Sequence, residues 1–239
     1  MHFFFHLFTG IILGLLLADI LGDEGWLLPC AFGAVLPDLV DKPVGYVLLP
    51  GVIGYGRFLF HSLPVALGIL ATGIILWRRR GSVIVLAVAL GVLFHQFLDT
   101  MWRQPAGWLD PLLGPVTGHR PIPPYYFLTL LRQNFEDPWE LFLGCVFVVC
   151  LLSYLERDRV VGVATAHPRG TVLVLGGAGL CLGFLSGAVL LLGIVGRYLG
   201  HRGPPPDLVL IFTVVFALAA LLAFRWAAAF RDRSRATGS

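Results

Sequence analysis

Long apolar runs separated by short polar stretches dominate the chain. Seven hydrophobic segments can be drawn, at residues 3–21, 26–39, 58–77, 82–100, 139–155, 171–196 and 207–229. Because the runs are contiguous rather than alternating, they indicate helices and not the strands of a barrel. The second segment covers roughly 20 Å at 1.5 Å per residue, so it either spans a thinned bilayer or re-enters. The pattern therefore predicts an all-α, polytopic transmembrane bundle of six to seven membrane segments.

The connections between these segments are uneven. Residues 44–56 are apolar but are interrupted by Pro50 and several glycines, which favours an irregular or re-entrant connection over a span. Residues 103–138 are rich in proline and comparatively polar, and they form the one large loop region. We accordingly predict a site-bearing region at 1–115, an extracytoplasmic loop at 116–138 and a three-helix scaffold at 139–239.

Composition agrees with a membrane protein. Hydrophobic residues make up 57% of the 239-residue chain and charged residues only 13%, whereas a soluble domain carries about 25% charged residues. The net charge of +3 does not indicate nucleic acid as a partner, since the arginines gather at segment ends. Membrane lipids are the expected surroundings.

The arginines set the expected orientation. Ten of them fall on one side if the third to seventh segments each cross once: Arg78, Arg79, Arg80, Arg157, Arg159, Arg169, Arg225, Arg231, Arg233 and Arg235. Positive charge concentrates on the cytoplasmic side of membrane proteins. We therefore expect a multi-pass protein of the plasma or inner membrane, with a cytoplasmic C-terminus. Seven crossings place the N-terminus outside.

This topology brings polar side chains from four segments to one depth. The stretch LFHQFLDT holds a histidine and an aspartate four residues apart, on one face of a helix. Ionisable residues inside membrane segments are costly and generally functional. The residues that map to the outer face are His6, Asp38, Asp41, His61, His95 and Asp99. If the second segment re-enters instead of crossing, His6 moves to the other side.

Histidine and aspartate together suit a divalent metal, with zinc the first choice and one or two ions possible. Arg57 lies one helical turn from His61, and arginine suits phosphate through paired hydrogen bonds. Plainer interpretations stay open. His95 and Asp99 could only fasten two helices, Ser62 could cap a helix, and Asp41 could pair with Lys42 or be solvated.

Four motifs in order carry a resemblance: His6, then PDLVD, RFLFHSL, and HQFLDT followed by GWLDPLLGP. Over residues 1–115 this order resembles the YdjM-like, membrane-bound, metal-dependent hydrolases, and it is similar to part of the ligand set of zinc-dependent phospholipase C. The resemblance implies metal ligands at His6, Asp38, Asp41, His61, His95 and Asp99, with Arg57 and Asp99 as catalytic candidates. The chain departs from the family pattern at Gly56, where a histidine is usual, and at Phe60.

Two classes of function follow. The first is a metal-dependent hydrolase that acts on a phosphoester, lipid or lipid-linked, or on a phosphorylated small molecule, through a metal-activated water at the outer interface. The alternative is an ion- or proton-coupled transporter, or a non-catalytic metal-binding membrane protein. The apolar middles of segments 171–196 and 207–229 speak against a charged path across the membrane.

Overall fold

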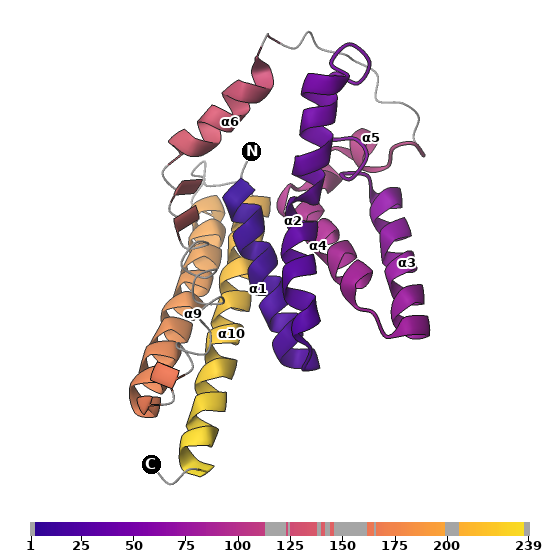
Figure 1. Ribbon diagram of the computed structural model, residues 1–239. Helices are drawn as coiled ribbons and strands as arrows, with labels where there is room; N and C mark the ends of the chain where they lie inside the picture. Colours follow the sequence, from indigo (N-terminus) through magenta and orange to yellow (C-terminus); the bar gives the residue numbers. More distant parts are fainter. Residues whose placement is uncertain are drawn as a thin grey trace. The chain divides into compact units, whose positions relative to one another are not determined.

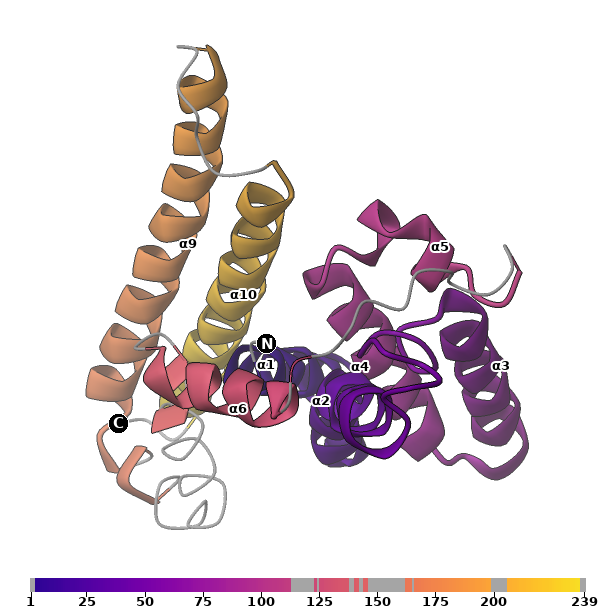
Figure 2. The ribbon, with the colours of Figure 1, turned by 90° about the horizontal axis from the view of Figure 1, so that it is seen from above.

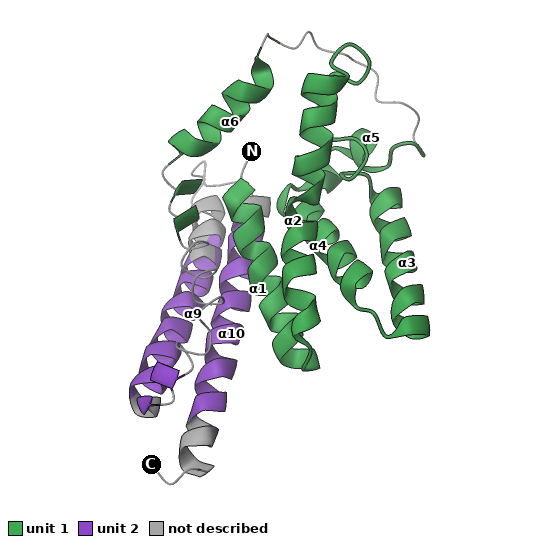
Figure 3. Cartoon of the chain, viewed as in Figure 1, with its two compact units in different colours: residues 1–148 green, residues 149–239 purple. Residues whose placement is uncertain are grey.

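The chain folds into helices in the computed structural model, which describes residues 3–112, 123, 125–137, 140–141, 144–145, 162–164, 166–198 and 206–236 (Figure 1). No strand occurs among these residues. Two compact units divide the chain, Met1–Val148 and Val149–Ser239 (Figure 3). The predicted segment 139–155 lies mostly outside the described residues. The domain boundaries expected from the sequence stay a prediction.

The first unit is built around four helices: α1 (Phe3–Leu21), α2 (Leu27–Pro43), α3 (Leu63–Arg80) and α4 (Ile84–Leu98). Shorter elements complete it: the 3-10 turn η1 (Glu24–Trp26), the π-helical turn η2 (Val44–Leu48), the 3-10 turn η3 (Met101–Arg103), α5 (Pro105–Trp108) and α6 (Tyr126–Glu136). Seen from above, α6 crosses the N-terminal end of α1 (Figure 2). The Phe4 amide donates to the Glu140 carboxylate at 2.8 Å, just beyond α6.

The helices α1 and α2 form a tight antiparallel hairpin. Gly22 turns the chain with a φ of +69°, and Asp23 accepts a hydrogen bond from the Gly25 amide. A Cβ on Gly10 would overlap Ala34 of α2, so the missing side chain lets the two backbones approach closely. Gly91 of α4 lies against the backbone of α2 in the same way, at Cys30, Gly33 and Ala34. This close packing of α1 and α4 against α2 fixes the relative depth of the polar residues on the three helices.

Beside the candidate site residues, two helix boundaries differ by four residues or more from the predicted segments. The helix α2 continues four residues beyond residue 39 and runs into η2, because Asp38, Asp41 and Lys42 find partners inside the protein. The helix α3 begins at Leu63 rather than at residue 58. Hydrogen bonds to Asp41 hold the preceding residues in a non-helical conformation.

Three described helices are long and apolar enough to cross a membrane: α1, Gly170–Ala188 within α9 (Pro168–Tyr198), and Val209–Phe230 within α10 (Pro206–Ala236). The helix α4 is apolar but shorter. In the second unit, α9 and α10 pack together, and the Ser186 hydroxyl donates to the Thr213 carbonyl at 3.0 Å. These spans support a membrane protein, and the number of six to seven crossings stays a prediction.

Candidate metal centre

Four side chains converge at one end of the first unit. Asp38 lies on α2, His61 in the segment before α3, and His95 on α4. Asp99 is the residue directly after α4, at its C-cap. One ligand atom from each lies within 4.8 Å of all the others. Asp38, His61 and His95 are buried and Asp99 is partly buried. This group can hold a metal ion.

The distances between the inward-facing atoms suit a small ion. His61 Nε2 and His95 Nε2 lie 3.2 Å apart. They lie 3.5 and 3.7 Å from Asp38 Oδ1, and 3.7 and 3.9 Å from Asp99 Oδ2. Ligands about 2.0–2.2 Å from a tetrahedral zinc are separated from one another by about 3.3–3.6 Å. The group is therefore close to the size that such an ion requires.

The outer nitrogens of both imidazoles are already engaged. His95 Nδ1 lies 2.7 Å from the Ala34 carbonyl oxygen, which can only accept, so this nitrogen carries the proton. His61 Nδ1 lies 2.8 Å from Asp41 Oδ2. With both rings neutral, two Nε2 lone pairs face each other across 3.2 Å. Such an arrangement is stable when a cation lies between them.

The electrostatics of the group also favour a cation. The carboxylates of Asp38, Asp41 and Asp99 lie 3.5, 2.8 and 3.7 Å from the ring nitrogens of His61. The oxygen Asp38 Oδ2 is buried and has no hydrogen-bond partner among the described residues. A proton or a metal ion can each supply the missing positive charge.

Asp41 lies behind His61 and outside the group of four. Its carboxylate is fully buried and accepts hydrogen bonds from the backbone amides of Phe58, Phe60 and His61, each at 3.1 Å, besides its bond to the His61 ring. Carboxylates placed in this way orient metal-binding histidines. The partner of Lys42 is Asp38, one helical turn back, and not Asp41.

His6 and Arg57 reach the group through Asp99. His6 Nε2 lies 3.1 Å from Asp99 Oδ1, and Arg57 Nη2 lies 2.8 Å from Asp99 Oδ2. The His6 ring also stacks near the His95 ring, with centroids 4.0 Å apart. His6 Nδ1 is buried without a hydrogen-bond partner in the part of the chain that the structure describes. The structure thus brings together every candidate site residue named from the sequence.

Gln96 holds the site together, although the sequence analysis did not single it out. Its amide donates to the Phe60 and Ser62 carbonyls at 3.0 and 3.2 Å, and it accepts from the Trp108 indole at 2.9 Å. The Ser62 hydroxyl donates to the Asp110 carbonyl, so Ser62 makes no side-chain cap for α3. The available signal was a third polar residue, Gln96, between His95 and Asp99 in an otherwise apolar run.

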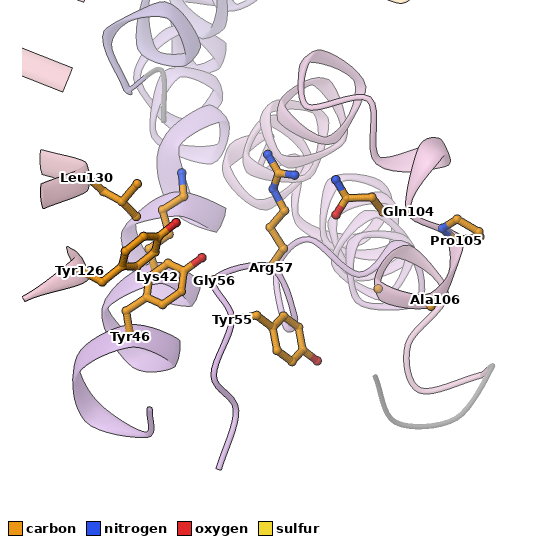
Figure 4. Close-up of a pocket in the computed structure, with 11 residues that line it drawn as sticks. Lys42, Tyr46, Tyr55, Gly56, Arg57, Gln104, Pro105, Ala106, Tyr126 and Leu130 are labelled. Atoms are coloured by element: carbon orange, nitrogen blue, oxygen red, sulfur yellow. The ribbon is translucent and has the colours of Figure 1, made fainter. Parts of the chain in front are cut away.

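A cavity of about 540 Å³ opens beside the group (Figure 4), and we call it the polar cavity for the charged and phenolic side chains among its walls. Lys42 and Arg57, the ion-pair partners of Asp38 and Asp99, both line it. Tyrosines 46, 55 and 126 form much of the remaining wall. A Cβ on Gly56 would lie 2.5 Å from a carbon of the Tyr46 ring, so Tyr46 takes the space beside the position where the family pattern has histidine.

The fold and the site define an all-helical membrane protein with a buried His/Asp group able to hold a metal ion. The chain belongs to the YdjM inner membrane protein family, whose model it matches over residues 1–185. The match continues past residue 115, where the sequence resemblance ended, into α9. Comparison with curated proteins and with solved structures gives no significant match.

Proposed function

We propose that this protein is an integral membrane, metal-dependent hydrolase that cleaves a phosphoester, lipid or lipid-linked, at the outer face of the membrane. The observation that carries the proposal is the convergence of two imidazole Nε2 atoms and two carboxylates on one point, next to a cavity lined by Lys42 and Arg57. Asp38, His61, His95 and Asp99 would hold the ion, with zinc favoured by the mixed nitrogen and oxygen ligands.

A divalent ion in such a site acts as a Lewis acid and lowers the pKa of a bound water towards neutrality. The protein's own residues do the rest. Arg57 is oriented by Asp99 and can donate paired hydrogen bonds to phosphate oxygens. Asp41 fixes the ring of His61, and Ala34 fixes that of His95. His6 donates from Nε2 to Asp99, which leaves its unpartnered Nδ1 as a proton acceptor.

In the reaction, water adds to phosphorus, the ester P–O bond breaks, and the departing oxygen takes up a proton. The charges beside the group fit such a substrate. Lys42 and Arg57 offset two of the three carboxylates of Asp38, Asp41 and Asp99, so a divalent ion leaves the site with excess positive charge. An anionic ester is then attracted, whereas a neutral ester is not.

The orientation forms part of this proposal. The hairpin of α1 and α2 and the ends of α3 and α4 place the group at one end of the unit, and the arginine pattern assigns that end to the outside. We expect an N-terminal reporter to be extracytoplasmic and a C-terminal reporter to be cytoplasmic. A cytoplasmic N-terminus contradicts the proposed orientation but does not contradict the proposed metal-dependent hydrolysis.

The decisive experiment measures the metal content of the full chain purified in detergent, followed by phosphate release from native lipids. Wild type should carry about one or two divalent ions per chain, and the double variant His95→Ala/Asp99→Ala should carry none. His167→Ala is the matched control, because His167 is exposed and lies outside the group. A metal-free wild type overturns the hydrolase proposal. Bound metal without phosphate release favours the ion-binding alternative.

A further inference from the structure

A second, apolar cavity of about 190 Å³ lies on the other side of the Asp38–Lys42 pair. Its walls are side chains of α1, of α2 and of α6. They are Phe3, Phe4, Asp38, Leu39, Pro43, Phe127, Leu131, Asn134 and Phe135. Apart from Asp38 and Asn134, these are hydrocarbon surfaces. Since Asp38 lines this cavity and its partner Lys42 lines the polar one, both cavities adjoin the candidate metal group.

The helix α6 borders both cavities. Tyr126 and Leu130, one turn apart, face the polar cavity. Phe127 and Leu131, also one turn apart, face the apolar one. The ring of Phe135 contacts Phe4 of α1, with centroids 6.2 Å apart, and the ring of Tyr126 contacts Tyr46, with centroids 5.0 Å apart. One short helix therefore covers a polar compartment and an apolar compartment together.

Asn134 gives the apolar cavity a specific polar feature. Its side chain is 5% exposed, and its Oδ1 has no hydrogen-bond partner among the described residues. A buried amide oxygen without a partner destabilises the empty cavity. That cost disappears when a ligand brings a hydroxyl or an ester group to the same place. An occupant made only of hydrocarbon leaves the amide unsatisfied.

From these features we propose that α6 covers a two-part site for a single amphiphilic phosphoester drawn from the membrane. The phosphate-bearing head lies in the polar cavity, between Lys42 and Arg57, and the hydrocarbon chain lies in the apolar cavity. Asn134 binds a polar group near the start of the chain. The proposal rests on the proposed function, which it extends by assigning the substrate to lipids through particular residues.

The test uses phosphonates, which cannot be hydrolysed at the P–C bond, and the full chain in nanodiscs of zwitterionic lipid. Hexylphosphonate has five more CH₂ groups than methylphosphonate. It should bind at least about 10-fold more tightly, because each buried CH₂ favours binding. Leu131→Trp, which fills the apolar cavity, should abolish this advantage.

Leu128→Trp is the matched control, because Leu128 lies on the same helix, is 58% exposed and lines neither cavity. If Leu131→Trp does not fold, Leu131→Phe should reduce, without abolishing, the tighter binding of hexylphosphonate over methylphosphonate. A third probe, 2-hydroxyhexylphosphonate, tests Asn134. Its gain over hexylphosphonate should be lost in Asn134→Leu.

Equal affinity for the short and the long phosphonate overturns the inference, as does an equal effect of the tryptophan at positions 128 and 131. Neither result alters the metal content or the measured release of phosphate from native lipids, on which the proposed function depends. Conversely, a metal-free protein that still binds the long phosphonate more tightly removes the hydrolase proposal and keeps the two-part site.

Discussion

The role of Asp41 leads to the sharpest prediction, because a ligand and an orienting residue behave differently. The variant is Asp41→Asn, which keeps the shape of the side chain and one acceptor oxygen. The native carboxylate accepts from three backbone amides and from the His61 ring. The asparagine NH₂ would point a donor at donors. Losing about two charge-assisted bonds at 1.5–3 kcal/mol each destabilises the 58–61 segment by about 3–6 kcal/mol.

Two measurements follow from this estimate. Hydrogen exchange of the metal-free protein should show lost protection at residues 58–61. Competition titration should show a metal affinity lowered roughly 10- to 100-fold, the usual effect of removing a residue that orients a metal-binding histidine. Asp23→Asn is the control, since the Asp23 side chain accepts an exposed hydrogen bond from the Gly25 amide at the opposite end of the α1–α2 hairpin. Unchanged protection at 58–61 in Asp41→Asn would refute the reasoning, even if metal affinity fell.

Three further predictions concern the support of the site. Gln96→Leu leaves two carbonyls and the Trp108 indole unpaired, so thermal unfolding in detergent should show a loss of about 1–3 kcal/mol for each group that stays dry; unchanged stability means that water replaces the amide. Gly91→Ala should cost about 1–3 kcal/mol by overlap with the α2 backbone, whereas Gly68→Ala, in open space on α3, should be neutral or stabilising. A chelator should lower the unfolding temperature of wild type, because a bound ion stabilises the folded state and the chelator removes it. It should leave the unfolding temperature of His95→Ala unchanged, because that variant binds no ion.

The sequence determined the class of fold and identified most residues of the candidate site. Hydropathy alone separates α1, α9 and α10 as candidate spans, because a helix in lipid must be long and apolar, whatever it packs against. The spacing of His95 and Asp99 placed both residues on one helix face, and polar residues in apolar runs marked His6, Asp38 and His61. Each of these signals is local, and each could be recognised without knowledge of neighbouring elements.

Only the tertiary structure decided which partners these residues have. Asp41 and Lys42 are adjacent in sequence, yet one turns towards His61 and the other pairs with Asp38. The choice depends on how the 58–62 segment folds back on α2. The roles of Gln96 and Asn134 likewise depend on contacts and cavities made by segments that are distant in the sequence. Hydrophobic periodicity carries no information about such contacts, because they depend on the close approach of helices that small residues such as Gly10 and Gly91 permit.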